Sequence, residues 1–179
     1  MRAIATPFAD LLVISSPLFR DHRGSFTKIY HQELFAGLGI SFPIAEQFVS
    51  VSRRNVLRGM HFQTPPAAHA KLVHCVGGAV LDVAVDLRQN SPTFRQHYSR
   101  ELNEENGEML LIPAGFAHGF LALVDGATML YLTTAGHSPE HDHGILWNSF
   151  GFPWPVESPV LSDRDRAFPP LEEFVTPFR

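Results

Sequence analysis

The sequence predicts an all-β fold of the sandwich or jelly-roll type, in which many short strands enclose a ligand cavity. Three observations favour this class. The chain of 179 residues contains 15 Phe, 13 Gly and 14 Pro, a composition typical of short strands separated by frequent turns. Apolar and polar residues alternate in many short runs, and only one stretch has a persuasive helical pattern. Counting these runs gives roughly ten strands.

The N-terminal part begins with strand-like runs. Leu11–Ile14 predicts an early strand, and Asp21–Gly24 predicts a turn before a half-buried strand over Ser25–Tyr30. His31–Leu38 is predicted to be helical, closed by Gly39. Further strands are expected at Ala45–Ser52, Leu57–Gln63 and Lys71–Val76, followed by a turn at Gly77–Gly78.

The longest alternating run is Ala79–Arg88. Its odd-numbered positions from 81 to 87 are apolar, whereas Asp82, Ala84 and Asp86 occupy the other face. This pattern predicts a strand with one core face and one polar face.

The C-terminal part continues in the same way. Strands are expected at His97–Leu102, Met109–Ile112, His118–Val124 and Thr128–Thr134, with turns at Asn106–Gly107 and Asp125–Gly126. The tail from residue 136 onward is rich in Pro, His and Asp, and we expect it to wrap the barrel and close part of the site. Since no shift in composition suggests a boundary, residues 1–179 are predicted to form one domain.

Charge and composition exclude several functional classes. The formal net charge is −4 and no Lys/Arg cluster occurs, which argues against nucleic-acid or anionic-membrane binding. Met1–Phe8 lacks the apolar run of a signal peptide, and nowhere do about 18 apolar residues follow one another. We therefore expect a cytoplasmic protein. Cys75 lies in an apolar run and suits a core position better than a nucleophile.

The chemistry is concentrated in Arg58–Lys71, which offers a guanidinium, an imidazole, a carboxamide and an amine within an apolar sequence. A metal site is the first possibility, because Pro113–His118 resembles one half of the cupin metal motif. The other half is missing, since Gln63 stands two positions after His61 where a second histidine is required. His141 and His143 fit solvated loop positions. We therefore expect no metal and no cofactor.

A set of ordered motifs resembles one group of the cupins, the dTDP-4-dehydrorhamnose 3,5-epimerase family. The motifs are Asp21–Phe26, Leu57–Gln63, Lys71–Val73, Asp82–Arg88, Ser91–Phe94, Ile112–Phe120 and Leu161–Asp165. Each is modest alone, but the ordered set is specific and covers most of residues 8 to 171. The resemblance implies a jelly-roll homodimer that acts without a metal on a nucleotide-linked 4-keto-6-deoxyhexose.

The chemistry of such a substrate requires a base, an acid and an enolate stabiliser, because the C3 and C5 hydrogens are both α to the carbonyl. His61 suits the base, since its ordinary pKa near 6.5 leaves it largely neutral at pH 7. Lys71 offers a positive charge for the oxyanion at O4. By resemblance, Asp165 is the carboxylate partner of His61 and Tyr131 the proton donor.

Each of these residues also has a purely structural interpretation. His61 fits a hydrogen-bonded core histidine, Lys71 a strand-edge lysine that discourages pairing, Tyr131 a barrel aromatic and Asp165 a helix cap. Taken singly, these interpretations are at least as good. They fail jointly, because all four residues fall in order within the matched segments.

Further positions are predicted to bind the substrate. Arg23 and Arg58 are assigned to diphosphate oxygens, and Phe26 to the nucleobase or sugar. Gln47, Gln63 and His118 are expected to face the hexose. The alternatives are an ordinary surface arginine at 23 and a buried, backbone-bonded histidine at 118.

Five positions depart from the pattern of the family. Lys28 stands where Glu is usual, which reverses a charge near the nucleotide, and Val49 replaces an amide near the sugar. His137 occupies the place of a second tyrosine. Asp142 and Arg164 replace Glu and Lys, which keeps the charge and changes reach and fork geometry.

The sequence thus predicts an epimerase of a nucleotide-linked 4-keto-6-deoxyhexose that inverts C3, C5 or both through an enolate. One alternative is a single-centre epimerase for a different nucleotide sugar, such as a CDP-linked one. Another is a non-catalytic cupin that binds a sugar nucleotide as a sensor. A metal-dependent cupin oxygenase or isomerase is more remote.

Overall fold

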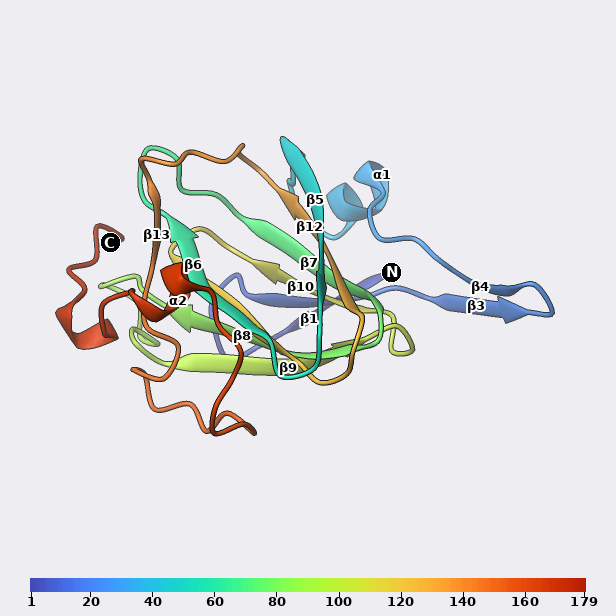
Figure 1. The fold of residues 1–179 in the computed structure, drawn as a ribbon. Helices are drawn as coiled ribbons and strands as arrows, with labels where there is room; N and C mark the ends of the chain where they lie inside the picture. Colours follow the sequence, from blue (N-terminus) through green and yellow to red (C-terminus); the bar gives the residue numbers. More distant parts are fainter.

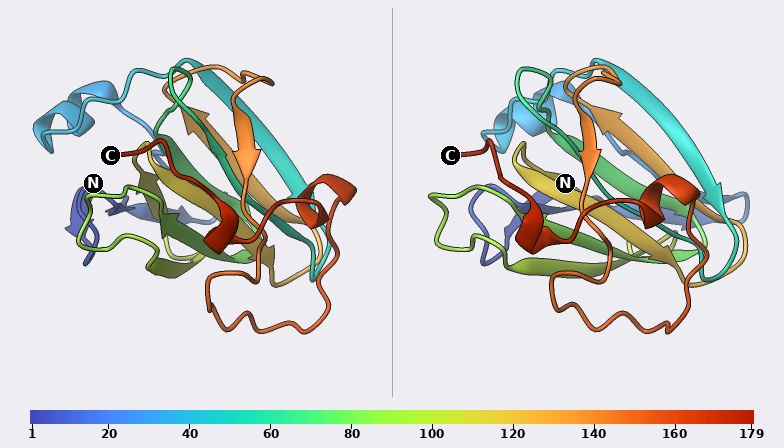
Figure 2. Two further views of the ribbon diagram at one scale, coloured as in Figure 1. Left: turned by 90° about the vertical axis from the view of Figure 1, so that its left-hand side faces the viewer. Right: turned by 60° about the vertical axis from the view of Figure 1, so that its left-hand side comes forward.

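Two antiparallel β-sheets pack face to face and enclose the interior of the protein (Figures 1 and 2). A computed structural model describes all residues from 1 to 179. The six-stranded sheet has the order β1-β2-β10-β7-β12-β5, and the five-stranded sheet has the order β13-β6-β11-β8-β9. Neighbours in these sheets are mostly distant in sequence, as in a jelly roll, so the predicted all-β fold is confirmed.

The strand bounds agree well with the alternating runs of the sequence. The six-stranded sheet consists of β1 (Arg2–Ala5), β2 (Leu12–Ser15), β10 (Glu108–Ile112), β7 (Lys71–Gly77), β12 (Ala127–Thr133) and β5 (Glu46–Ser52). The five-stranded sheet consists of β13 (Asp142–Gly144), β6 (Leu57–Gln63), β11 (Phe116–Ala122), β8 (Ala79–Asp86) and β9 (His97–Asn103).

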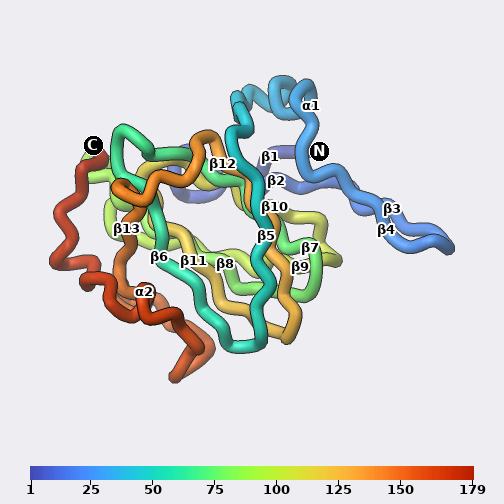
Figure 3. Tube along the Cα trace, turned by 45° about the horizontal axis from the view of Figure 1, so that its top comes forward, coloured from blue at the N-terminus to red at the C-terminus, as the bar shows by residue number.

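A separate hairpin formed by β3 (Leu18–Asp21) and β4 (Gly24–Thr27) projects from the body of the sandwich (Figures 1 and 3). The predicted turn lies at its tip. The prediction of a half-buried strand over Ser25–Tyr30 was wrong, because β4 ends at Thr27 and Phe26 is 59% exposed. This strand pairs only with β3 and belongs to neither sheet of the sandwich.

One helix covers part of the outer face of the six-stranded sheet. Helix α1 (Gln32–Gly37) lies within the predicted helical stretch. Its buried Phe35 packs in a cluster with Phe42 and with outward-facing residues of four strands, Ile14, Leu72, Met109, Leu111, Leu130 and Leu132. The helix therefore fixes the sheet that carries β7 and β12.

The space between the sheets is filled mainly by apolar side chains, including Val73, Val80, Phe120 and Met129. Cys75 belongs to this cluster and is fully buried, so the predicted core position is confirmed. Burial raises the pKa of its thiol to about 11. A thiol of this kind is protonated at neutral pH and is a poor nucleophile.

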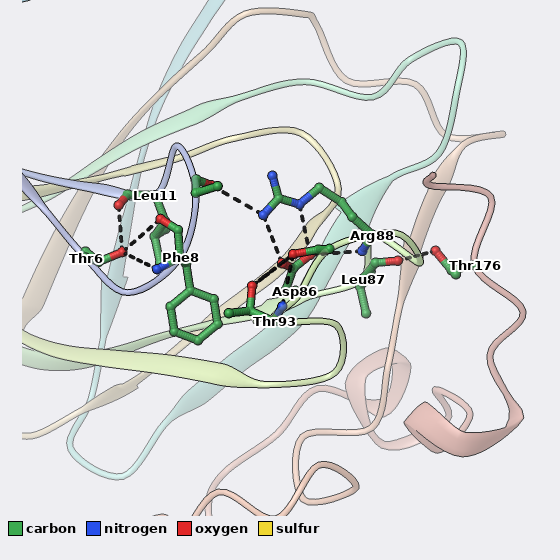
Figure 4. A network of polar contacts seen from close by, with 10 residues as sticks. Thr6, Phe8, Leu11, Asp86, Leu87, Arg88, Thr93 and Thr176 are labelled. Carbon is green, nitrogen blue, oxygen red and sulfur yellow. Dashed lines mark hydrogen bonds and ion pairs between the residues drawn. The ribbon is translucent and has the colours of Figure 1, made fainter.

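Strand β8 is buried on both faces, which corrects the prediction of one polar face. Its apolar outer face packs under the C-terminal segment, where Leu171 and Phe178 complete a second cluster. On the inner face the two aspartates are buried because each has partners. Asp82 contacts His118, and Asp86 binds Arg88, Ser91 and Thr93 (Figure 4).

The tail wraps the five-stranded sheet, as the sequence predicted. It contributes β13 to the edge of the sheet beside β6, then helix α2 (Asp163–Arg166) and the short 3-10 helix η1 (Leu171–Glu173). Thr176 also donates a hydrogen bond to the Leu87 carbonyl (Figure 4). No helix of the protein is long and apolar enough to cross a membrane.

Candidate active site

A cavity of about 230 Å³ opens at one end of the sandwich. Glu46 and Lys71 begin β5 and β7, Gln63 and Thr133 end β6 and β12, and Asp142 begins β13. All five line the cavity. Because neighbouring strands are antiparallel, the start of one strand lies beside the end of the next, and these strand ends meet at the same end of the sandwich. The remaining lining residues are Phe48, His61, Phe62, His69, His137 and Arg164.

His61 forms a dyad with Asp165, as predicted. Its Nε2 lies 2.7 Å from Asp165 Oδ1, while Asp165 Oδ2 accepts a hydrogen bond of 3.2 Å from the Gly59 N–H. Ser162 caps α2 by accepting from the Asp165 N–H. The carboxylate is therefore held firmly and is 3% exposed. With Nε2 engaged, Nδ1 is the nitrogen of His61 left to act on a substrate.

The environment suits His61 to be a neutral base. Burial lowers the pKa of His61, and the hydrogen bond and charge of Asp165 offset part of this effect. Burial alone raises the pKa of Asp165, but its contacts with His61 and Gly59 hold that pKa below the ordinary value. At neutral pH the dyad therefore pairs a neutral imidazole with a carboxylate that stabilises a developing imidazolium.

Two glycines let β6 and β11 approach closely beside the dyad. A Cβ on Gly59 would lie 2.6 Å from the Gly119 Cα, and Gly59 has a φ of +127° that side-chain-bearing residues rarely adopt. His61 pairs directly with His118 across the two strands at this point. The glycines thus bring the two histidines onto neighbouring positions.

His118 is buried and is not among the residues that line the cavity, so its contact with the hexose stays a prediction. Its Nε2 lies 2.9 and 3.0 Å from the two carboxylate oxygens of Asp82. The alternative of a buried histidine was right about burial, but the partner is a carboxylate and not the backbone.

Lys71 lies beside the dyad and donates a hydrogen bond of 3.2 Å from Nζ to the His61 carbonyl. Its strand β7 is flanked by β10 and β12, so the interpretation as a strand-edge lysine is wrong. Burial lowers the pKa of Lys71 to about 8, and the charges of Asp142 and Asp82 limit the fall. The ammonium is therefore present at neutral pH and available to an oxyanion.

Tyr131 lies between two rings. Phe48, its direct partner across β5 and β12, stacks on it at 4.6 Å with an interplanar angle of 13°. His118 meets it edge-on at 6.2 Å. The hydroxyl contacts Ser50 Oγ at 3.3 Å, the residue is 7% exposed, and burial raises its pKa. Tyr131, assigned by resemblance as the proton donor, is not among the residues that line the cavity, whereas Phe48 is.

The predicted residues His137, Asp142 and Arg164 come together at the rim. Arg164 Nη2 lies 2.8 Å from Asp142 Oδ1, and His137 Nδ1 lies 3.8 Å from Asp142 Oδ2. The backbone N–H of His137 donates to Glu46 Oε2 at 2.8 Å. These contacts combine charges of both signs around the cavity mouth.

Sequence reasoning missed five lining residues, Glu46, Phe48, Phe62, His69 and Thr133. His69 stands two positions before Lys71, so the period of two residues in a strand was the available signal. Burial lowers the pKa of His69, and the nearby Lys71 charge lowers it further.

Gln63 was expected to face the hexose, but its carboxamide is used by the protein. Nε2 donates to the carbonyls of Ala67 and Gly136 at 2.9 and 3.2 Å, and Oε1 accepts from the Ser138 N–H at 2.7 Å. Gln63 therefore ties together the two loops that border the cavity.

Gln47 and Val49 alternate with Phe48 along β5 and so point away from the cavity. This corrects their predicted positions for the single chain. Arg58 lies at the opposite end of β6 from Gln63, and its guanidinium donates to Ser52 Oγ and the Val51 carbonyl.

Arg23 and Phe26 belong to the projecting hairpin, and Lys28 follows it directly. None of the three lines the cavity that holds His61. Arg23 pairs with Asp21 within the hairpin. Their predicted contact with the substrate is therefore not made within one chain.

The comparisons with known proteins agree with this geometry. The family model of dTDP-4-dehydrorhamnose 3,5-epimerase matches residues 5–173. The chain belongs to this family. A dTDP-4-dehydrorhamnose 3,5-epimerase of Salmonella typhimurium is 43% identical, with 97% of each chain covered. The predicted family is thus confirmed.

Solved structures of the family share the fold closely. The enzyme of Bacillus anthracis, solved with TDP and pyrophosphate bound, has a TM-score of 0.92 at 42% identity, covering 95% of this chain and 99% of that chain. A 3′-monoepimerase of Streptomyces bikiniensis, in complex with dTDP-quinovose, has a TM-score of 0.88 at 34% identity, covering 96% of this chain and 88% of that chain. The family thus includes epimerases of one centre.

Proposed function

We propose that this protein inverts C3 and C5 of a dTDP-linked 4-keto-6-deoxyhexose by removing and returning protons through an enolate. The observation that carries the proposal is the dyad of His61 and Asp165, whose imidazole lines a cavity beside the buried ammonium of Lys71. A base and a fixed cation in one small cavity are what proton removal next to a carbonyl requires.

His61 Nδ1 takes the proton from the carbon next to the C4 carbonyl; the electron pair of that C–H bond forms a C=C bond to C4, and the π pair of the carbonyl moves to O4. Asp165 stabilises the imidazolium that forms, because its carboxylate already holds Nε2. Lys71 stabilises the negative O4. A preorganised donor of this kind contributes about 3 to 4 kcal/mol to the transition state. The reaction drawn in this way uses no metal and no cofactor.

Tyr131 returns the proton to the opposite face of the ring. Its phenol remains protonated at neutral pH because burial raises its pKa. Phe48 separates the phenol from the cavity, so a bound sugar takes the place of the Phe48 ring, which is 43% exposed and belongs to an edge strand. The proton that reaches carbon leaves a phenolate on Tyr131, and a proton from solvent restores the phenol.

The nucleotide diphosphate is assigned to two arginines, Arg164 at the cavity and Arg58 toward the other end of β6. Arg58 and Arg164 offer planar forks suited to phosphate oxygens. His137 and Asp142 at the rim are assigned to the nucleoside. TDP and pyrophosphate bound to the Bacillus anthracis relative support a dTDP-linked substrate.

We infer a homodimer in which the β3–β4 hairpin reaches the cavity of the second subunit. The hairpin carries Phe19 and Phe26, which are 63% and 59% exposed, and it stands clear of its own sandwich (Figures 1 and 3). Val49 and Val51 are also exposed, on the free edge of a sheet. Exposed apolar groups of this kind mark interfaces. Arg23, Phe26, Lys28 and Gln47 then contact substrate across the dimer.

Mixed dimers test this arrangement. His61→Ala and Arg23→Glu subunits are co-expressed with different tags, and the heterodimer is purified. If the hairpin serves the neighbouring subunit, one of the two sites in each heterodimer is complete, and about half of the wild-type activity returns. Activity no greater than that of either inactive parent contradicts the shared site, and a monomer in sedimentation contradicts the dimer.

Product analysis tests the activity itself. The purified protein is incubated with dTDP-4-keto-6-deoxyglucose, the ketone is reduced with borohydride, and the sugars are identified by NMR. Inversion at both C3 and C5 is expected. His61→Ala should form no product, whereas His97→Asn, a control whose ring packs on Phe152 outside the cavity, should retain activity. Recovery of unchanged sugar with the wild-type protein contradicts the proposal.

A single-centre epimerase is the second candidate. The 3′-monoepimerase of Streptomyces bikiniensis, 34% identical to this chain, gives the precedent, and the same product analysis distinguishes the two because it assigns each carbon separately. We also propose that residues 1–179 act as one domain in the cytoplasm, where a lone buried thiol such as Cys75 stays reduced.

A further inference from the structure

The buried carboxylate of Asp82 has no part in the mechanism described above. It lies in the middle of β8 and is fully buried. Both of its oxygens contact one atom, Nε2 of His118, at 3.0 and 2.9 Å. A buried carboxylate is costly unless a partner compensates it. The pair therefore fixes Nε2–H as a donor and sets the orientation of the His118 ring.

The His118 ring in turn contacts the proposed acid. It meets Tyr131 edge-on, with 6.2 Å between ring centroids and an interplanar angle of 69°. Phe48 covers the opposite face of the phenol at 4.6 Å. Tyr131 is thus held between a partly exposed ring of an edge strand on the cavity side and a ring anchored by Asp82 on the interior side.

We propose that Asp82 is a positioning residue, which acts through His118 to hold Tyr131 where it protonates the enolate from the face opposite His61. This inference rests on the proposed function. Asp82 lies behind His118 and does not line the cavity, so its effect on proton return passes through His118. The dyad of His61 and Asp165 acts independently on the proton-removing side.

The two sides compete for the enolate. After His61 removes the proton and exchanges it with solvent, His61 returns a deuteron to the same face, with retention, or Tyr131 returns one to the opposite face, with inversion. A poorly placed Tyr131 slows only the second path. Loss of Asp82 therefore raises the ratio of exchange with retention to inversion.

Asp82 also acts on Lys71 through its charge. The charged groups that face Lys71 are Asp82 on β8, Asp142 on β13 and Arg164 on α2. Asp82 and Asp142 raise the pKa of Lys71 against burial, while Arg164 lowers it. Removing the Asp82 charge lowers the pKa of Lys71 further, so the alkaline limb of the pH profile moves to lower pH.

The test compares Asp82→Asn with Asp86→Asn. Asp86 is a matched control because it lies four residues along the same strand, on the same face, and is also fully buried. Its partners are Arg88, Ser91 and Thr93, away from the cavity (Figure 4). Each variant is incubated with dTDP-4-keto-6-deoxyglucose in D2O, and NMR measures retention and inversion at each carbon.

For Asp82→Asn we expect the ratio of retention to inversion to rise at least about fivefold. We expect kcat to fall about 10- to 100-fold, the range seen when carboxylates that orient histidines in metal sites are removed, with KM nearly unchanged. Asp86→Asn should lower thermal stability and leave the ratio at the wild-type value. Because the ratio compares two paths on the same active molecules, it does not depend on the folded fraction.

A double-mutant cycle identifies the route of the effect. If Asp82 acts through His118, then Asp82→Asn adds nothing to the ratio in a His118→Asn background. An unchanged ratio in Asp82→Asn overturns the inference, even where kcat falls or the alkaline limb moves. Failure of the wild-type protein to exchange or invert overturns the proposed function itself, which separates the two results.

Discussion

Replacing Asp165 with asparagine tests the dyad most sharply, because the side chain keeps its shape and loses its charge. Asp165 Oδ1 lies 2.7 Å from His61 Nε2 in a site where the carboxylate is 3% exposed. A hydrogen bond to a charged group contributes about 1.5 to 3 kcal/mol. At 1.36 kcal/mol per factor of ten, we expect kcat to fall about 10- to 150-fold.

The pH profile gives a second readout with a defined sign. Asp165 raises the pKa of His61 against the larger effect of burial, which lowers it. Without that charge the pKa of His61 falls further, so the neutral base persists to lower pH. The acidic limb of kcat/KM should therefore move to lower pH in Asp165→Asn.

The assay measures kcat and kcat/KM for epimerisation between pH 5 and 9. Asp163→Asn is the control, because Asp163 belongs to the same helix, is exposed, and pairs only with Arg166. Two results refute the reasoning: a drop in kcat of less than about twofold in Asp165→Asn, or an acidic limb that moves to higher pH. Loss of a hydrogen bond to a charged group should lower kcat by more than about twofold.

Three further results are expected. Wild-type kcat/KM should fall as pH rises through about 8, where Lys71 loses its proton. Lys71→Met should lower kcat/KM about 100- to 1000-fold at pH 7. An unchanged kcat/KM in this variant contradicts the role of Lys71 in stabilising the enolate. Gly144→Ala should lower the free energy of unfolding by about 1 to 3 kcal/mol in urea titrations, because the new Cβ lies 2.3 Å from the Phe168 ring, whereas Gly37→Ala, with open space around it, should not. His137→Tyr should change KM for the dTDP-sugar and leave kcat within about twofold in steady-state assays, because a rim side chain contributes to binding alone.

Most of the sandwich was predictable because alternation along a strand reports directly which face is buried. The hairpin was not. Ser25–Tyr30 alternates like a half-buried strand, but nothing in the pattern reveals that the strand ends at Thr27, pairs only with β3 and leaves Phe26 exposed. The prediction that β8 has a polar, exposed face was wrong because, in the sequence, a buried aspartate cannot be distinguished from a solvent-facing one until its partner is known.

The candidate site was predictable in its residue types more than in its arrangement. His61 and Lys71 stood out in the sequence, but Asp165 is 104 residues from His61 and followed only from the family resemblance. Gln63 fits a sugar ligand and a loop tie equally well, and only the backbone atoms around it decide. No role was predicted for Asp82 from the sequence, because its proposed role depends on its contact with His118, which lies on a different strand.

The central claim is that His61 removes a proton next to the C4 carbonyl. Position-resolved deuterium incorporation into dTDP-4-keto-6-deoxyglucose in D2O measures this step directly, whatever product follows. The account predicts deuterium at C3 and C5 with the wild-type protein, and none above the enzyme-free rate with His61→Ala. Incorporation at the wild-type rate in His61→Ala, or none with the wild-type protein, contradicts it.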